Sequence, residues 1–422
     1  MSRAASDKSF TLTHGCRNDA AVLQIPDSSL FAGGTVPAGS DRKPCQRAAS
    51  EPRMVRAALG QAMPSDVMTG SAIAFVLYDV GEEIRIDQLR QGSGARRAEG
   101  PSKHPTPEYV GFQRPPVVQD AGEHCLAAGE RVRSRVKFYD YGVVSILVGT
   151  PFQGDWRDWI ELASRWMASG EFEQYARELA RQYTARLGPA LVKRYDSWLS
   201  EDYFVFHLAE VPGMPLASDL IACHGNEIAQ IVRGETCALS DGEKNEVLQA
   251  RISYYPRDLA VIGWHGAFVY DTIAGAQSAI ELLEHSNSQL LEFRHYDELL
   301  TRELQAGYKF LERGSPAIHR WRLAREGARL QRVTLDVTEL TERSDNAIKF
   351  LSDMFAARLY NLAAAKVGVN DYKALVEEKL RTAASLYSYM IGEFHQARAF
   401  VLELMVVIIL IIELVFLFRG KP

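Results

Sequence analysis

The sequence predicts an α+β protein: an N-terminal mixed α/β head, then a bundle of long C-terminal helices, then one transmembrane helix. Three observations carry this prediction. Short β-branched and aromatic runs, typical of strands, recur between residues 70 and 270. Long apolar periodicity typical of helices dominates after Asp271. The stretch Ala399–Phe418, AFVLELMVVIILIIELVFLF, contains no Lys, Arg, Gly or Pro.

We divide the chain into four segments on this basis. Residues 1–69 are rich in Ser, Ala, Gly, Pro and Arg without an apolar period, so we expect a disordered extension. Residues 70–270 form the predicted α+β domain, and residues 271–395 the predicted helical stalk or bundle. The transmembrane helix is placed at 396–418.

The head begins with Ser71–Val80, SAIAFVLYDV, a short strand of β-branched and aromatic residues. The following GEEIRIDQL indicates a second strand that turns into a helix. Residues 91–120 contain five prolines and are predicted to be a loop. The strongest strand signal is Arg135–Pro151, in which Gly142 is interpreted as a bulge.

The remainder of the head alternates helices and strands. Asp155–Leu187 is predicted to be helical, with Asp155 as its N-cap. Ser200–Glu210 and Glu246–Tyr255 are predicted strands, and Leu216–Gln230 lies between them as a helix. We therefore expect an antiparallel or mixed sheet.

Four long helices are predicted after residue 271. They are Ala276–Leu311, Ala317–Arg343, Asp345–Val367 and Tyr372–Phe418. In the last of them one apolar stripe runs through Val376, Leu380, Ala383, Tyr387, Met390 and Phe394. The stripe continues in phase into the apolar end, so we expect one helix of about 70 Å, with Gly392 as its weakest point.

The apolar end is predicted to be a C-terminal membrane anchor, because twenty helical residues span about 30 Å, the thickness of a bilayer core. Glu403 and Glu413 interrupt it. They lie roughly 80° apart on a helical wheel, so both can face one neighbouring helix. Two interpretations stay open: an oligomer contact, or carboxyl groups that are protonated or reach the lipid headgroups.

Composition excludes some classes of function. The net charge of −5 and pI near 6.1 argue against a general nucleic-acid binder. The five cysteines form no CxxC pair, so no classical zinc site is expected. The N-terminus shows no secretory signal. Neither GxxxxGK[ST] nor GxGxxG occurs, and no GxSxG, so no phosphate loop or nucleophile elbow is predicted.

Four segments carry a resemblance to a known family. They are FYDYGVV at 138–144, EHSNSQLLEFRHYDELL at 284–300, SDMFAARLYN at 352–361 and LELMVVIILIIEL at 402–414. In this order they resemble the required-for-meiotic-nuclear-division (RMND/YagE) family, which carries domain of unknown function 155, and are most similar to its prokaryotic branch. The resemblance covers roughly residues 70–418.

The resemblance implies a membrane-anchored protein. The mitochondrial member is an inner-membrane protein that supports mitochondrial translation and assembles into large complexes, and fungal members are linked to sporulation. No catalytic residues are established for the family, so the resemblance assigns none here.

Glu292 and His295 form a Glu-x-x-His pair, the half-motif of di-iron bundles. Glu281 and His285 lie on the same helical stripe. Leucines and Phe293 occupy the opposite face, so we interpret the Glu/His stripe as the solvated side of an amphipathic helix. No metal site and no cofactor are predicted.

Arg294 and Asp297 fall instead on the apolar side of this helix, with i,i+3 spacing that allows them to pair. We interpret them as a polar clamp between helices or subunits, or, if the helix phase is different, as exposed residues. With Glu403 and Glu413 they form the predicted assembly residues.

The other candidates for metal or nucleophilic chemistry are Cys223-His224, Cys237, His207 and His265. We interpret them as small core residues. A cluster of His207, His224 and His265 in the folded protein would favour an enzyme, and their separation would favour a non-catalytic role.

The function predicted from the sequence is a non-catalytic, oligomeric assembly or tethering protein, anchored in a membrane by a single span. Most of the chain is expected on the cytoplasmic side, or the matrix side in an organelle. Its expected partners are the lipid bilayer, further copies of the chain and an unidentified protein, but not nucleic acid. The alternative is a membrane-tethered enzyme with its site in the α+β domain.

A third reading, tethering of ribosomes or RNA, would need a basic patch. The candidates are Arg320, Arg322, Arg325, Arg329 and Arg332, but they are interleaved with Leu at mixed spacing, so a solvated helix face explains them better.

Overall fold

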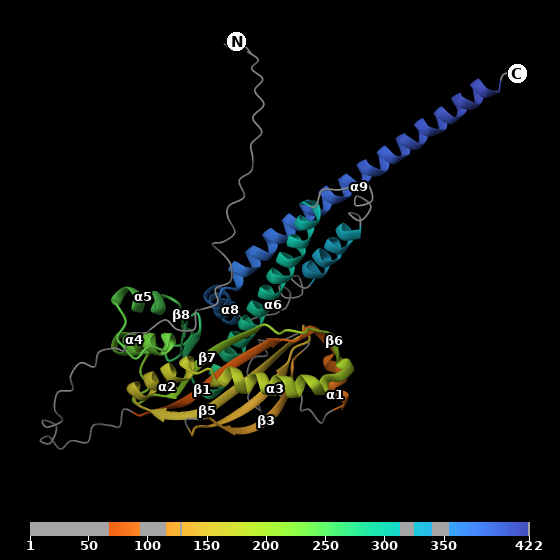
Figure 1. Ribbon diagram of the computed structural model, residues 1–422. Coiled ribbons are helices and arrows are strands. Elements are labelled where there is room, and N and C mark those ends of the chain that lie inside the picture. Colours follow the sequence, from red (N-terminus) through yellow and green to blue (C-terminus); the bar gives the residue numbers. More distant parts are fainter. Residues whose placement is uncertain (1–66, 93–114, 127–128, 313–324, 340–353, 421–422) are drawn as a thin grey trace, which may run out of the picture. The chain divides into compact units, whose positions relative to one another are not determined.

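The structure is a computed structural model that describes residues 67–92, 115–126, 129–312, 325–339 and 354–420 (Figure 1). It is an α+β protein, with a sheet and shorter helices first and long helices after residue 271, as predicted. The predicted N-terminal extension, residues 1–69, lies almost wholly outside the described residues.

The main sheet of the described chain has eight strands in the order β3-β4-β5-β1-β7-β10-β9-β8. These strands are β1 (Met68–Asp79), β3 (Val117–Cys125), β4 (Arg131–Phe138), β5 (Val143–Gly154), β7 (Ser200–Glu210), β8 (Arg251–Ile252), β9 (Leu259–Ile262) and β10 (Gly266–Tyr270). The β7–β10 pair is parallel, and the other neighbours are antiparallel. A second sheet pairs β2 (Gly81–Ile84) with β6 (Leu191–Arg194).

β1 lies in the middle of the main sheet, between β5 and β7. This central position explains why β1 is apolar along most of its length. Its alternate side chains belong to two separate cores: Ala74 and Val76 to one, Phe75 and Leu77 to the other. A strand that is buried on both faces needs apolar residues at consecutive positions rather than an alternating pattern.

One face of the sheet is covered by short helices. They are α2 (Trp156–Ala168), α3 (Glu171–Leu187), α4 (Ala217–Arg233) and α5 (Asp241–Gln249), and α1 (Ile86–Gly92) follows β2. Asp155 caps α2 as predicted: its carboxylate accepts from the backbone N–H groups of Arg157 and Asp158. The predicted helix 155–187 is therefore confirmed, except that it is two helices separated at Ser169 and Gly170.

The other face packs against long helices (Figure 1). They are α6 (Ile273–Glu312), α8 (Met354–Val367) and α9 (Val369–Arg419), and residues 325–339 form a further helix. Leu282, Leu291 and Phe293 of α6 share one core with Phe75 of β1 and Val205 of β7. The head and the helical region therefore have this core in common.

α9 is one continuous helix of 51 residues, as the apolar stripe predicted, and it runs through Gly392 without a break. Val376, Ala383 and Met390 are buried on the predicted stripe. Ala383 and Met390 pack with Leu304 of α6. At 1.5 Å per residue α9 is about 76 Å long.

Two strand predictions are wrong. Arg135–Pro151 is not one bulged strand but most of a hairpin, in which Gly142 has φ +93° in the turn between β4 and β5. In place of the predicted strand Glu246–Tyr255, the end of α5 is followed by the two-residue β8. β3, β9 and β10 were not predicted.

Candidate functional site

The middle of α6 is buried on every side, from Leu282 to Phe293. The sheet covers one side of this segment, and α8 and α9 pack against α6 as well. The prediction that Glu292 and His285 lie on a solvated face is therefore wrong. His295 is also largely covered, with 14% of its side chain exposed.

Polar side chains from five parts of the chain meet in this buried region, and we call them the buried polar cluster. Its members are Asp79, Lys137, Tyr139, Tyr141, Tyr195, Glu284, His285, Ser288, Gln289, Glu292, His295, Tyr296 and Tyr360. Most come from the first three segments that carry the family resemblance: 138–144, 284–300 and 352–361. Segments far apart in sequence thus build one polar interior.

The turn between β4 and β5 supplies two tyrosines to this cluster. Tyr141 Oη lies 2.7 Å from Ser288 Oγ on α6. Burial, together with the Glu284 carboxylate, holds the pKa of Tyr139 well above its usual range, so this phenol stays protonated. On the far side of α6, Tyr360 of α8 donates a hydrogen bond to Gln289 Oε1. The cluster therefore joins the sheet to α8 through α6.

Asp79 and His295 form an acid–base pair within the cluster. His295 Nδ1 lies 2.8 Å from Asp79 Oδ2, and the Asp79 carboxylate is almost fully buried. Tyr195 stacks on the imidazole, with ring centroids 4.5 Å apart. The two groups are within ion-pair distance, but Asp79 Oδ2 has no hydrogen-bond partner among the described residues, so the contact is an ion pair and not an aligned hydrogen bond.

Glu292 lies near this pair and is buried. Its Oε2 accepts a 2.5 Å hydrogen bond from Tyr296 Oη. Burial raises the pKa of Glu292 well above its usual range, and the nearby Asp79 charge raises it further. Burial likewise raises the pKa of Asp79, against the opposing effect of His295. The two carboxyl groups therefore favour carrying one negative charge over carrying two.

Glu284, one α6 turn before Ser288, has no exposed side-chain surface and is paired with Lys137 of β4 at 2.5 Å. Its Oε1 lacks a hydrogen-bond partner among the described residues, as do Asn287 Oδ1 and Glu292 Oε1. Desolvation lowers the pKa of the neighbouring His285 to about 4, so its imidazole is neutral at physiological pH.

The predicted assembly residues Arg294 and Asp297 do not pair with each other. Arg294 pairs with Glu201 of β7. Asp297 pairs with Lys379 of α9 at 2.6 Å, and Lys379 also donates to Thr301 Oγ1 at 2.6 Å. Both positions lie on the covered side of α6, so each ties that helix to a different neighbour: Arg294 to the sheet and Asp297 to α9.

The three histidines proposed as a test of catalysis have different surroundings. His207 Nε2 lies 2.8 Å from the Asp271 carbonyl oxygen, beyond one end of β10. His265 pairs with Asp202 at 3.2 Å, before the other end of β10. His224 stacks on Trp156. They therefore form no common site.

The structure also bears on the remaining candidates for metal, nucleophilic or nucleic-acid chemistry. Cys223 is exposed, so its interpretation as a core residue is wrong. Among the described residues no group of three or more His, Cys, Asp and Glu side chains has metal-binding geometry. Arg320 and Arg322 of the candidate basic patch lie outside the described residues, and Arg329 pairs with Glu303 at 2.8 Å.

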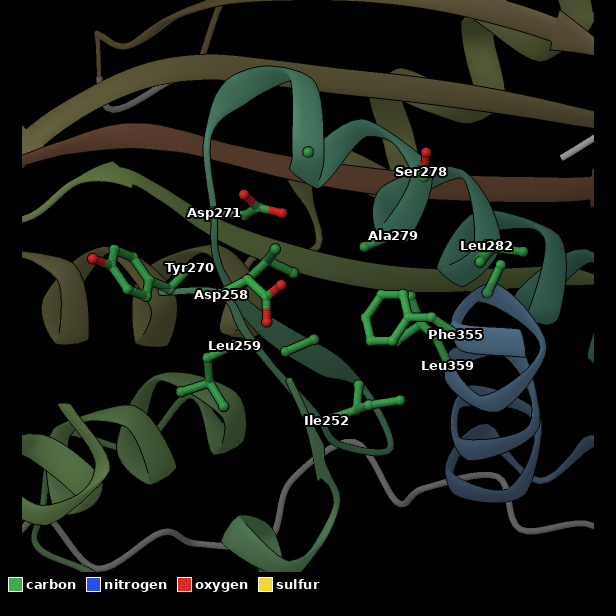
Figure 2. Close-up of a pocket in the computed structure, with 14 residues that line it drawn as sticks. Ile252, Asp258, Leu259, Tyr270, Asp271, Ser278, Ala279, Leu282, Phe355 and Leu359 are labelled. Carbon is green, nitrogen blue, oxygen red and sulfur yellow. The ribbon is translucent and has the colours of Figure 1, made fainter. Parts of the chain in front are cut away.

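A pocket opens beside β8, β9 and β10, next to the first turns of α6 and α8 (Figure 2). Ile252, Leu259, Leu282, Phe355 and Leu359 provide apolar walls. The carboxylates of Asp258 and Asp271 lie on one side of the space, and the ring of Phe355 lies across from them. The sequence carries no signal for this pocket, because its lining comes from five separate elements and the loops beside them.

The C-terminal part of α9 is the one helix, within the described residues, that is long and apolar enough to cross a membrane. None of its most apolar window is buried in the protein. Glu403 and Glu413 are both exposed there. A single-pass membrane anchor is consistent with these properties.

Comparison with known proteins finds a similarity for the first half of the described chain. Residues 69–277 match the family model described as the N-terminal domain of the uncharacterized protein MJ0711. The uncharacterized protein MJ0711 of Methanocaldococcus jannaschii is 19% identical over 197 residues, which are 44% of this chain and 58% of that relative. The chain thus spans less than two thirds of this relative. No solved structure gives a significant match.

The matched residues begin in β1 and end in the first turn of α6. They include the eight-stranded sheet and the helices on its first face. Most of α6, α8 and α9 lie beyond the match, so the similarity concerns the head alone.

Proposed function

We propose that the protein is a membrane-anchored assembly or tethering protein without catalytic activity, which holds its α+β head next to a bilayer and associates with further copies and an unidentified protein partner. The observation that carries this proposal is the continuity of α9. Its first half packs on α6, and its last turns are apolar and uncovered. A single rigid element thus serves as both part of the folded body and anchor.

The resemblance of four segments to the RMND/YagE family supports the same proposal, because members of that family are membrane-anchored and form complexes. The acidic balance of the chain, −5 overall, gives no support to nucleic acid as a partner. In this proposal the bulk of the chain lies on the cytoplasmic side, or on the matrix side in an organelle.

The test is extraction of membranes with alkaline carbonate. The full-length protein is expected to remain in the membrane pellet, and a chain ending at Glu393 is expected in the supernatant, because burying the apolar segment in lipid drives retention. Equal retention of the two chains would overturn the anchor. Protease added to right-side-out vesicles is expected to leave the head intact, and digestion there would reverse the proposed orientation.

A second candidate function, a membrane-tethered enzyme, is favoured by one observation. His295 Nδ1 lies 2.8 Å from the carboxylate of the buried Asp79, a pairing that also occurs at general bases. His295→Gln keeps a polar side chain there but removes the basic nitrogen. If this variant loses the protein's cellular function while it keeps its stability and its assembly, the enzyme reading replaces the tethering one.

A further inference from the structure

The pocket beside β8, β9 and α6 has a lining that is complementary to one kind of ligand. Apolar side chains form most of it, and two carboxylates form one side (Figure 2). Pockets of this composition orient a largely apolar ligand through a few polar groups. The charge of those groups then decides which ligands are accepted.

The two carboxylates are held in place by backbone groups. Asp258 Oδ1 and Oδ2 accept from the N–H groups of Tyr254 and Tyr255, at 2.7 and 2.8 Å. Asp271 Oδ1 accepts from the N–H of Thr272 at 2.6 Å. These bonds fix the side chains toward the pocket without neutralising them.

Neither carboxylate has a cationic partner in ion-pair contact among the described residues. Partial burial raises the pKa of Asp271, against the hydrogen bond from the Thr272 N–H, and the negative charge of Asp258 raises it further. The His207 imidazole acts in the opposite direction, but only as the smallest of the contributions. A cation placed between the carboxylates would offset the effect of the Asp258 charge.

The opposite wall fits the apolar part of such a cation. Phe355 lines the pocket, and the exposed Tyr254 packs against it with ring centroids 5.2 Å apart. Aromatic faces attract ammonium and guanidinium groups and cover aliphatic stems. Leu282 and Leu359 extend this apolar wall inward.

We propose that this pocket binds an ammonium or guanidinium group carried on an aliphatic stem, with the cation between Asp258 and Asp271 and the stem against Phe355. Such a group occurs in a free alkylamine and in a Lys or Arg side chain of another protein. The proposal is independent of the membrane anchor and of the assembly, since the pocket is lined by the sheet, α6 and α8 and not by α9.

The experiment uses the full-length protein in zwitterionic nanodiscs and ligand-observed NMR. The probes are n-butylammonium, 1-butanol and butyrate, which share the stem and differ in charge. Butylammonium is expected to bind saturably, and the other two about tenfold more weakly or not at all, the effect of losing one charge-assisted hydrogen bond. Equal binding of the three probes, or no saturable binding of butylammonium, would overturn the proposal.

Two variants locate the binding. Asp258→Asn with Asp271→Asn keeps an oxygen that can accept the backbone hydrogen bonds, and it is expected to weaken butylammonium binding about tenfold or more. Ala279→Met fills the pocket and is expected to abolish it. Asp196→Asn, at an exposed position outside the lining, is the matched control and should change nothing. Unaltered binding in both pocket variants would contradict the assignment.

The two sources of the ligand are distinguished by peptides. If Gly-Gly-Lys-Gly-Gly binds more tightly than butylammonium and Gly-Gly-Leu-Gly-Gly does not bind, the ligand is a side chain of a protein partner. Butylammonium that binds without the lysine peptide identifies a small molecule. Both outcomes support the proposal that the pocket binds a cation on an aliphatic stem. Binding of the leucine peptide as tightly as the lysine peptide would contradict it.

Discussion

Glu292 is a carboxyl group wholly inside the protein, hydrogen-bonded to Tyr296 and close to the buried Asp79. Burial, followed by the Asp79 charge, raises its pKa well above 4.5. The folded protein therefore holds a proton over a pH range in which the unfolded chain has already released it. Since the folded state binds more protons, this group makes the protein less stable as pH rises from about 4.5 toward the raised pKa.

Replacing Glu292 with Gln removes this dependence while it keeps the hydrogen bond to Tyr296. We expect Glu292→Gln to be at least as stable as the wild type at pH 8, with a flatter stability profile above pH 5, since each unit of pKa difference corresponds to about 1.4 kcal/mol. Thermal unfolding of the full-length protein in detergent across pH measures this. Glu298→Gln, at an exposed position on the same helix, is the control. A variant with the wild-type slope would contradict the raised pKa.

Arg294 stabilises the contact of α6 with the sheet through Glu201, whose side chain is only 15% exposed. Arg294→Ala leaves that carboxylate covered and unpaired. We expect a loss of about 1–3 kcal/mol, below the cost for a fully buried pair because Arg294 is about one third exposed. Denaturant unfolding measures it, with the exposed Arg302→Ala as control.

The double variant Arg294→Ala with Glu201→Gln separates this pair from a general loss of packing. Removing the stranded charge is expected to restore part of the stability. A double variant whose loss equals the sum of the two single losses would show that the pair carries no coupling.

For single residues, the sequence predicted which side of the helix a side chain lies on better than it predicted which residue that side chain pairs with. A helical wheel placed Arg294 and Asp297 on the covered side, and each is indeed paired there, but with residues 93 and 82 positions away. The wheel failed for His285 and Glu292 because it assumes one covered face. α6 is covered by the sheet on one side and by helices on another, so polar residues can be interior on either.

At the scale of elements, the turn between β4 and β5 decides the position of Tyr139 and Tyr141. Gly142 has φ +93°, and a Cβ on it would overlap the carbonyl oxygen of Gly81. Both the backbone conformation and the close approach to β2 therefore require glycine.

Gly142→Ala is expected to destabilise the protein by about 3 kcal/mol or more, because backbone strain of about 1–2 kcal/mol adds to a steric overlap. Gly122→Ala is a matched control: Gly122 has φ +86° with open space around its Cβ, so it should cost the strain alone. Chemical denaturation of the two variants tests this. Equal losses would mean that the approach to β2 relaxes without cost.

Elements were predictable where one local signal dominated. Ser200–Glu210 was placed at its observed bounds, because a strand buried at consecutive positions has a dense apolar run. The β4–β5 hairpin was read as one strand because its turn, DYG, lies between aromatic strand-forming residues. The pairs that build β9 and β10 are set by contacts across the sheet, which periodicity does not contain.

In the whole molecule, the proposed anchor is the apolar end of α9, which carries the acidic residues Glu403 and Glu413, and assembly would give them partners. An isolated span would gain from Glu413→Leu, whereas contacts between helices in a membrane are worth about 0.6–2 kcal/mol each. We therefore expect Glu413→Leu to insert into the membrane and to form a weaker oligomer.

Light scattering coupled to size exclusion in detergent measures the mass of the particle. The matched control is Glu393→Leu, which lies before the apolar segment. An unchanged mass for Glu413→Leu would mean that this carboxyl group faces lipid or water instead of a neighbouring copy.

Because α9 is unbroken, its length and its helical turn relate the distance and the orientation of the folded body to those of the apolar end. Ala397 is the last buried residue of this helix, and the apolar stretch begins only two positions later. Each residue inserted between them would lift the folded body about 1.5 Å from the bilayer and turn it by about 100° around the helix axis. If the proposed anchor and assembly hold, the number of residues at this junction therefore determines which side of the head faces neighbouring copies and how far the head lies from the lipid.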